Sequence, residues 1–192
     1  MREGKTRYVI LGLLSERPMS GYMVKKLVDA RFRFFWSESY GQLYPELKAL
    51  LREGLVEIDD DAALRPEEPV PTPSTAGRRD RIAYRIAPAG REALRRWLDR
   101  PAERESVRFE ILLKMYFAGQ GDRKALQASL REFEAHYATE RATLDRYQEE
   151  LERIPDERGD HRDVLRVIDF GQKSYDAYLA WCRGTFAEWE GR

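Results

Sequence analysis

The chain is poor in the residues that form disulfides and metal sites. Its 192 residues include one cysteine, Cys182, and two histidines, His136 and His161. A single cysteine excludes an internal disulfide framework and fits a reducing compartment, so we expect a cytoplasmic protein. Because histidines and thiols are so few, we expect no metal site built from them.

Long apolar runs are also absent. No stretch of about 18 apolar residues occurs, which predicts that no helix crosses a membrane. The N-terminus is basic and briefly apolar, but Ser15-Glu16-Arg17-Pro18 follows without a small-residue cleavage site, so we expect no signal peptide. With 42% hydrophobic and 35% charged residues, the chain has enough apolar surface to fold around a core.

No arrangement of residues typical of an enzyme is present. The chain has no glycine-rich phosphate loop, and Gly119-Gln120-Gly121 is predicted to be a turn between helices. Cys182 lies on an apolar helical seam, where a buried and unreactive thiol is expected. We therefore predict no catalytic residue, no cofactor and no enzymatic activity, and a hydrolase or transferase is disfavoured.

Charge is unevenly distributed, although the net charge is zero. Residues 1–100 hold 19 Lys and Arg against 15 Asp and Glu, whereas residues 101–192 hold 15 against 19. Residues 78–100 alone hold eight basic and three acidic residues. A nucleic-acid interface is therefore sought in the N-terminal half, although many solvated surfaces show so small an excess.

The first 100 residues predict three helices, a pair of strands and a fourth helix. Apolar residues recur at helical spacing over residues 8–14, 22–30 and 43–51, and Pro88 fits the first turn of the fourth helix. Ser20 is placed to cap the second helix.

The third helix has clear start and stop signals. Ser39 and Gln42 have the spacing of a capping box, and Gly54 stands where a helix normally ends. Strands are predicted at residues 55–58 and 81–86, on either side of a proline-rich loop. This order is typical of a winged helix-turn-helix with a two-stranded wing.

The C-terminal half predicts long helices. Apolar positions step by four and three from Leu126 to Ile154 and again from Val164 to Trp189, with a polar break between them. Glu140, Gly171 and Thr185 occupy positions of these two ladders as imperfections. We therefore predict a mainly α protein with an antiparallel helical hairpin in residues 101–192. Because a two-helix hairpin has little core of its own, we expect it to dimerise. Before the hairpin, the sequence predicts a shorter helix whose single apolar face is formed by Phe109, Leu112, Leu113, Tyr116 and Phe117.

The third helix supplies the main candidates for DNA contact, because such a helix places its N-terminal residues at base edges in the major groove. Glutamine can pair with adenine, and lysine with guanine or phosphate. An ordinary capped, half-exposed helix would carry the same residues, so both interpretations stay open. The candidates off the leucine face are Ser39, Tyr40, Gln42, Tyr44 and Lys48.

The predicted wing supplies further candidates. Arg78, Arg79 and Arg81 are placed where arginine contacts phosphate or enters the minor groove. Glu67 and Glu68 in the same loop favour a solvated loop instead. The conformation of the proline-rich insertion, residues 64–77, stays open.

Two other groups of residues are weaker candidates. Lys5, Ser20 and Tyr22 begin the first two helices, where helix-turn-helix proteins hold phosphates, although core packing explains Tyr22 equally well. The aromatic residues between the second and third helices fit a wall for a flat apolar effector, but a core or dimer contact is the commoner role. The effector candidates are Phe32, Phe35 and Trp36.

These motifs together resemble the PadR family of bacterial transcriptional regulators. The resemblance covers nearly the whole chain, and the long C-terminus is similar to the larger subfamily. The matching residues are Tyr8-Val9-Ile10-Leu11-Gly12-Leu13-Leu14, Met19-Ser20-Gly21-Tyr22, Gly41-Gln42-Leu43-Tyr44-Pro45-Glu46-Leu47, Glu53-Gly54-Leu55-Val56, Tyr84-Arg85-Ile86-Ala87-Pro88-Ala89-Gly90-Arg91 and Phe109-Glu110-Ile111-Leu112-Leu113-Lys114.

The resemblance implies a function and a division of the chain. Such proteins are homodimers that bind palindromic operators, usually as repressors, and many are released by a small aromatic or hydrophobic effector. Residues 1–100 would bind DNA and residues 101–192 would dimerise. Ala87 departs from the family's usual threonine and removes a helix cap. The alternative is a helical ligand- or partner-binding module that does not read DNA.

Overall fold

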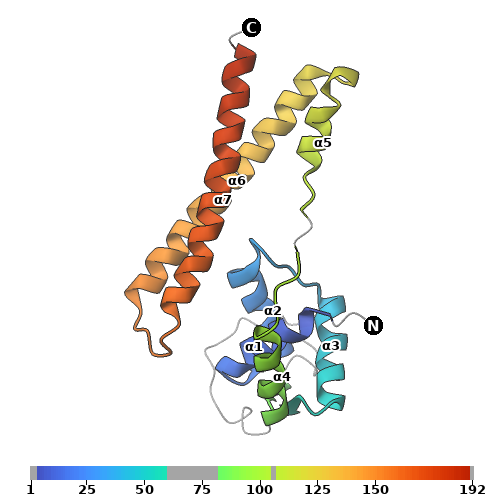
Figure 1. Cartoon of the computed structure of the whole chain (residues 1–192), viewed down its shortest axis with the longest axis vertical. Helices are drawn as coiled ribbons and strands as arrows, with labels where there is room; N and C mark the ends of the chain where they lie inside the picture. The colour runs from blue at the N-terminus through green and yellow to red at the C-terminus, as the bar shows by residue number, and fades with distance from the viewer. Residues whose placement is uncertain (1–3, 60–81, 105–106, 191–192) are drawn as a thin grey trace, which may run out of the picture. The chain divides into compact units, whose positions relative to one another are not determined.

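A computed structural model describes residues 4–59, 82–104 and 107–190. The chain divides into two compact units, Met1–Arg104 (unit 1) and Glu105–Arg192 (unit 2), which are described separately (Figure 1). Within the described ranges, no helix is both long enough and apolar enough to span a bilayer.

Unit 1 follows the order expected from the sequence. Its elements are α1 (Thr6–Glu16), β1 (Met19–Ser20), α2 (Gly21–Leu27), the π-helical turn η1 (Val28–Phe32), α3 (Tyr40–Arg52), β2 (Val56–Ile58), β3 (Ala83–Ile86) and α4 (Pro88–Leu98).

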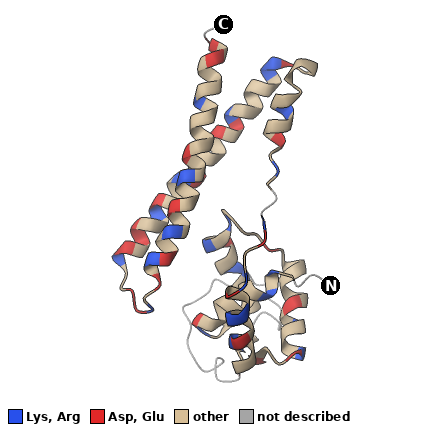
Figure 2. Ribbon diagram, viewed as in Figure 1, with Lys and Arg blue, Asp and Glu red and all other residues tan. Residues whose placement is uncertain are grey.

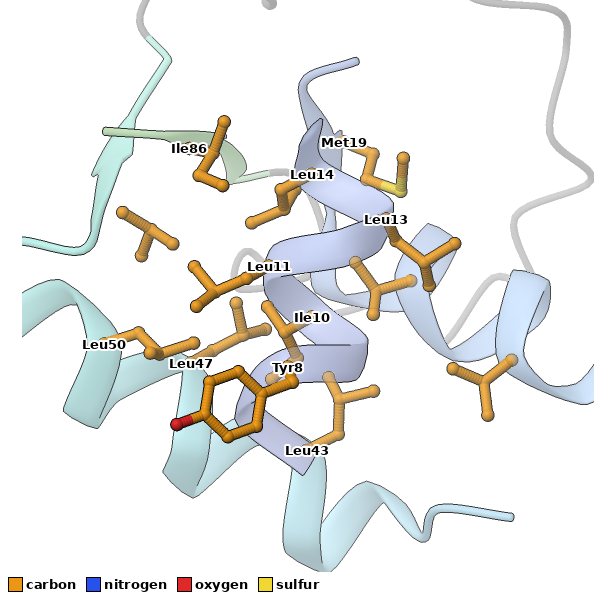
Figure 3. Packing of buried hydrophobic residues seen from close by; sticks show 13 residues of the cluster. Tyr8, Ile10, Leu11, Leu13, Leu14, Met19, Leu43, Leu47, Leu50 and Ile86 are labelled. Carbon is orange, nitrogen blue, oxygen red and sulfur yellow. The ribbon is translucent and has the colours of Figure 1, made fainter. Parts of the chain in front are cut away.

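The core of unit 1 is aliphatic. Leu43, Leu47 and Leu50 recur every three or four residues on α3, so they share one face and are fully buried. Figure 3 shows this face packed against the side chains of α1, where Leu11 is also fully buried. Burying each such side chain contributes about 1.5–3 kcal/mol relative to leaving it exposed. This packing fixes α3 on α1 and leaves the opposite face of α3 in solvent.

The sheet has one more strand than the sequence predicted. The predicted hairpin is present, with Val56 opposite Ile86 in the antiparallel β2–β3 pair. The additional strand, β1, pairs antiparallel with β3 on its other edge, and Met19 lies opposite Tyr84. Two residues are too short to show the alternation that identifies a strand. The winged helix-turn-helix class is confirmed, with a three-stranded rather than a two-stranded sheet.

Two glycines shape the path from α3 to α4. Gly54 has a φ of 68°, a left-handed conformation that suits glycine, and ends α3 as predicted. Gly90, in the first turn of α4, lets this helix approach the backbone of the residue before β2. A Cβ at Gly90 would lie 2.1 Å from the carbonyl oxygen of Leu55, which is shorter than any tolerated contact.

Unit 2 is built around the helical hairpin that the sequence predicted. Its elements are α5 (Glu110–Tyr116), the 3₁₀ turn η4 (Ala118–Gln120), α6 (Arg123–Arg153) and α7 (His161–Glu190). Asp122 caps α6 by accepting a hydrogen bond from the Lys124 backbone N at 3.0 Å. Cys182 is fully buried on α7, as expected, and burial raises the pKa of its thiol.

The hairpin seam is less apolar than its stepping suggested. Leu130, Leu144 and Ile168 are buried as expected, and so is Glu140, the acidic residue of the first ladder. Gln172, which lies on neither ladder, is also buried. Six aromatic rings form a continuous cluster with centroid separations between 4.5 and 6.3 Å. These rings belong to Phe109, Phe133, Tyr137, Tyr175, Tyr178 and Trp181.

The apolar face predicted around α5 is only partly correct. Phe109 packs inward, but the buried residue of α5 is Ile111, one helical turn before the half-buried Met115. The remaining predicted residues are exposed, because α5 is apolar on two sides and only one side meets the hairpin. The exposed residues are Leu112, Leu113, Tyr116 and Phe117.

Candidate nucleic-acid interface

The N-terminus of α3 is closed by a capping box, as predicted. The Gln42 side-chain oxygen Oε1 accepts hydrogen bonds from the Ser39 backbone N at 3.1 Å and from the Ser39 hydroxyl at 2.9 Å. Both residues are exposed. A bidentate pair with adenine uses the oxygen and the nitrogen of the glutamine amide. Gln42 would therefore have to release the cap to read a base in this way.

Two tyrosines and a lysine lie along one edge of α3, where Tyr40 and Lys48 are exposed and Tyr44 is half-buried. The Tyr40 and Tyr44 rings stack one helical turn apart, with centroids 6.0 Å apart and planes inclined by 18°. The Lys25 ammonium of α2 lies 5.3 Å from the centroid of the Tyr40 ring. Lys48 follows on the same helix and is exposed. The sequence did not identify Lys25, because the contact depends on how α2 packs beside α3.

An arginine of α1 is paired with the middle of α3 and with the residue that follows its last turn. The Arg7 guanidinium contacts Glu46, with Nε 3.4 Å from Oε1, and Glu53, with 2.5 Å between NH2 and Oε2. The Arg7 side chain is largely buried. These ion pairs hold α3 in register along α1. The two glutamates are seven residues apart in the sequence, and nothing in the sequence identifies Arg7 as their partner.

The segment leading into α3 is held by a buried carboxylate. Glu38 is only 5% exposed, and its Oε1 accepts hydrogen bonds from the Thr6 hydroxyl at 2.9 Å and from the Trp36 indole at 2.8 Å. A buried carboxylate is stabilised by such donors. Glu38 therefore ties the segment before α3 to the start of α1, and the sequence analysis missed it because an acidic residue before a helix is usually solvated.

Two of the three candidates at the start of the first two helices, Ser20 and Lys5, have structural partners. The Ser20 hydroxyl accepts a hydrogen bond from the Met23 backbone N at 3.2 Å, which confirms Ser20 as the cap of α2. Tyr22 is half-buried. Lys5 forms an ion pair with Glu103, with 3.5 Å between Nζ and Oε1. None of these contacts joins Lys5 or Tyr22 to the Tyr40–Tyr44 edge.

The basic residues around the wing divide into two groups. Arg78, Arg79 and Arg81 lie outside the described residues. Within the described part, Arg85 of β3 pairs with Glu57 of β2 at 2.9 Å. Figure 2 shows acidic residues interspersed with basic ones over the helices, rather than a surface of one sign. The basic excess of residues 78–100 is therefore partly neutralised locally.

The three residues predicted to line an effector pocket have different environments. Phe32 is half-buried and packs against the core of unit 1. Phe35 is exposed, with its ring centroid 5.6 Å from that of Phe32. Trp36 is half-buried and bonded to Glu38. The structure thus brings Phe32 and Phe35 together and directs the Trp36 indole towards a carboxylate.

One group of possible cation ligands occurs among the described residues. Ligand atoms of Asp156, Asp160 and His161 lie within 4.8 Å of one another at the turn between α6 and α7. Asp156 Oδ1 accepts hydrogen bonds from the backbone N atoms of Asp160 at 3.0 Å and His161 at 3.4 Å. These bonds cap the start of α7, which accounts for the cluster.

Taken together, α3 presents polar and aromatic side chains away from its buried leucines. Hydroxyl, amide and ammonium groups on this edge can donate hydrogen bonds to phosphates or base edges. Arg7 and Glu38 connect the helix, and the segment before it, to α1. A rigid helix with such a face suits insertion into a groove of duplex DNA.

Comparison with protein families divides the chain in the same way. Residues 10–96 match the model described as "Transcriptional regulator PadR-like family", and residues 107–189 match "Virulence activator alpha C-term". The Negative transcriptional regulator PadR of Bacillus subtilis (strain 168) is 31% identical over 112 residues, which are 58% of this chain and 55% of that protein. The matched segment thus spans about half the length of this curated relative.

Solved structures share the fold over nearly the whole chain. The PadR-like regulator BC1756 from Bacillus cereus aligns with a TM-score of 0.76 at 24% identity, covering 97% of this chain and 99% of that one. Bacillus subtilis PadR in complex with operator DNA gives 0.76 at 23% identity, covering 98% and 99%. The Vibrio cholerae virulence activator AphA gives 0.69 at 23% identity, covering 97% and 98%. Bacillus subtilis PadR has also been crystallised with p-coumaric acid.

Proposed function

We propose that this chain is a transcriptional repressor that binds an inverted-repeat operator as a homodimer. The proposal is supported by the match of residues 10–96 to the PadR-like regulator model and of residues 107–189 to the virulence activator C-terminal model, which fits the larger PadR subfamily. Its proposed compartment is the cytoplasm, where its DNA target would lie. The relatives are described as transcriptional regulators rather than enzymes, and we propose no enzymatic activity for this chain.

The exposed edge of α3 is the observation that carries this proposal. Leu43, Leu47 and Leu50 anchor one face of the helix in the core, while the side chains of Tyr40, in its first turn, and Lys48 are exposed. Arg7 fixes the helix from α1. Lys48 is proposed to bind phosphate or guanine, and Gln42 to contact bases after leaving the capping box. Proposed flanking contacts come from Lys5, Ser20, Tyr22, Arg78, Arg79 and Arg81.

The exposed side of α5 supports the homodimer. Leu113 is 62% exposed and Tyr116 is 83% exposed in the single chain, although both are large and apolar. Large apolar side chains grouped on one surface are typical of an interface between proteins. A two-fold dimer would present two α3 helices, and this geometry leads to the proposed inverted repeat.

A selection from randomised duplexes tests the proposal directly. The full chain is incubated with duplexes of about 30 base pairs, enough for two half-sites a helical turn apart, and the bound DNA is sequenced. An enriched inverted repeat is expected. Recovery of unenriched sequences would leave the alternative of a module that does not read DNA. Gln42→Ala should relax the base preference, whereas Ala138→Gln, at an exposed position on α6, is the matched control.

The effector is proposed to be a small aromatic or hydrophobic molecule, with Phe32, Phe35 and Trp36 as candidate contacts. The p-coumaric acid complex of Bacillus subtilis PadR supports this chemical class. A bound ligand raises the unfolding temperature by mass action. Thermal unfolding with a panel of phenolic acids and planar drugs is therefore expected to identify stabilising compounds, and those compounds should release the selected duplex.

A further inference from the structure

Lys25 occupies an unusual position next to the N-terminus of α3. Its side chain is only 12% exposed, and its ammonium donates hydrogen bonds to both carboxylate oxygens of Asp29, one turn further along. The same ammonium lies 5.3 Å from the centroid of the Tyr40 ring. One cation therefore contacts both an acid within its own segment and the first residue of the helix proposed to enter the groove.

The partner of Lys25 is easily replaced. The Asp29 side chain is 56% exposed, and an ion pair with an exposed member is weak because water and salt compete for the exposed charge, here the carboxylate. The order also matters, since a lysine four residues before an acid is the less favourable orientation along a helix. In α7, Asp169 precedes Lys173 in the favourable order, with 2.7 Å between Oδ2 and Nζ. The Lys25–Asp29 pair is thus poorly explained as a helix-stabilising contact.

A DNA phosphate is a stronger partner for this ammonium than Asp29. A lysine that neutralises a phosphate releases condensed counterions, which adds a favourable free energy that an intramolecular carboxylate does not supply. Contact with the Tyr40 ring keeps the ammonium beside the start of α3.

We propose that Lys25 is a DNA-contacting residue whose ammonium exchanges Asp29 for a backbone phosphate, so that Asp29 restrains the affinity of the protein for DNA. This inference rests on the proposed function and deepens it by naming a regulatory contact within the interface. Asp29 competes with the DNA for the same cation, and its removal frees Lys25.

Fluorescence anisotropy with the duplex recovered by selection tests the exchange. Affinity is measured over a series of KCl concentrations for the wild type, Asp29→Asn, Lys25→Gln and the double variant. Asp29→Asn is expected to bind roughly two- to fivefold tighter, the fold-change equivalent of a partly exposed ion pair. Lys25→Gln should bind more weakly and lower the salt slope by about one. In the Lys25→Gln background, Asp29→Asn should change nothing further.

Two controls separate this exchange from other effects. Asp169→Asn removes the same charge from a matched pair in α7 and should leave DNA affinity unchanged. Lys25→Arg keeps the cation and should retain the wild-type salt slope, which a merely structural role would not require. Thermal unfolding of each variant identifies loss of fold.

The outcomes distinguish the inference from the function on which it rests. If Asp29→Asn tightens binding equally with lysine or glutamine at position 25, the effect is general charge repulsion and the exchange is wrong. An unchanged salt slope in Lys25→Gln would also overturn it, while the proposed function would stand. A wild-type protein that binds no duplex would overturn both.

Discussion

The two units of this chain bury different kinds of side chain. Unit 1 encloses an aliphatic core drawn from α1, α2, α3 and the sheet, with residues such as Leu11 and Leu47 fully buried. Unit 2 joins α6 and α7 through edge-to-face and tilted aromatic rings and polar contacts, and leaves large apolar residues such as Tyr116 on its surface. Unit 1 therefore has the core of a self-sufficient domain, whereas unit 2 is incompletely packed in a single copy.

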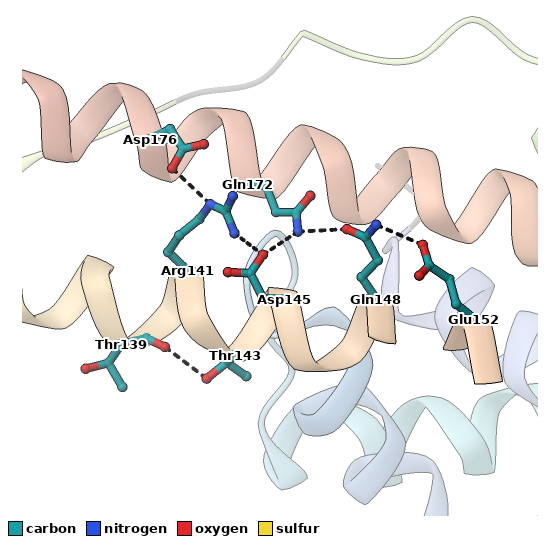
Figure 4. Close-up of polar contacts among 8 residues, drawn as sticks. All are labelled: Thr139, Arg141, Thr143, Asp145, Gln148, Glu152, Gln172 and Asp176. Atoms are coloured by element: carbon teal, nitrogen blue, oxygen red, sulfur yellow. Dashed lines mark hydrogen bonds and ion pairs between the residues drawn. The ribbon is translucent and has the colours of Figure 1, made fainter. Parts of the chain in front are cut away.

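The polar contacts of unit 2 form a connected network across the hairpin, drawn in Figure 4. Gln172 of α7 donates hydrogen bonds to Asp145 at 2.8 Å and to Gln148 at 3.0 Å. Arg141 of α6 contacts Asp176 of α7 at 2.9 Å and also pairs with Asp145. Polar partners must meet at fixed positions, so this network specifies the register of the two helices, which apolar packing alone would leave loosely defined.

The largest effect is expected from the core of unit 1. Leu11→Ala should lower the free energy of unfolding by about 2–5 kcal/mol, because it leaves a cavity among fully packed side chains. Leu98→Ala, at a position 65% exposed on α4, should change it by about 0.5 kcal/mol or less. Urea denaturation measures both. A similar loss in the two variants would contradict the description of unit 1 as a closed core.

A substitution in the exposed apolar surface of α5 should weaken the dimer. Leu113→Glu is expected to weaken the dimer at least about tenfold, or ~1.4 kcal/mol, because it places a charge in an apolar interface. Sedimentation equilibrium measures the change. Ala138→Glu adds the same charge at an exposed position on α6 and should leave the dimer intact. Equal association in both variants would remove the α5 surface from the interface.

The polar network should contribute a smaller share to the stability of unit 2. Gln172→Ala removes the donor of two hydrogen bonds at a buried position and is expected to cost about 1–2 kcal/mol. Gln120→Ala, at an exposed position, is the control. Both are measured by urea denaturation under conditions in which the protein stays dimeric. No difference between them would show that the aromatic cluster alone holds the hairpin.

The smallest effect concerns the pH dependence of unit 2. Burial raises the pKa of Tyr137, and the neighbouring Tyr178 and Glu140 raise it further. A phenol with a raised folded-state pKa stabilises the fold below the ordinary tyrosine pKa of about 10, and this stabilisation is lost as pH rises through the folded-state value. The free energy of unfolding should therefore fall at alkaline pH. Tyr137→Phe should reduce that fall, and an identical pH profile would contradict the assignment.

The predicted and observed structures agree where the signal is local. Ser20, Ser39 and Gly54 act as helix caps or ends, because capping depends on residues within one turn. The hairpin of α6 and α7 follows from apolar stepping over many turns. Pro45 lies inside α3 without ending it, which shows that burial of the leucine face outweighs an unfavourable residue near the first turns.

The residues missed in the candidate site all act through contacts distant in sequence. Glu38 bonds to Thr6, and Arg7 pairs with Glu46 and Glu53. Lys25 reaches Tyr40 from a neighbouring helix. The sequence does not identify these partners, because it holds many other residues of the same charge. Which of them meet is decided only when the helices pack.

The sequence by itself determined the order of the elements, the leucine face of α3 and the length of the hairpin, because periodicity and capping operate within a few residues. Only the tertiary structure decided which side of α5 is buried, which acids neutralise the arginines, and that Gln172 enters the seam. These choices depend on the surfaces that meet when helices pack, and an ion pair or a buried face exists only once both partners are in place.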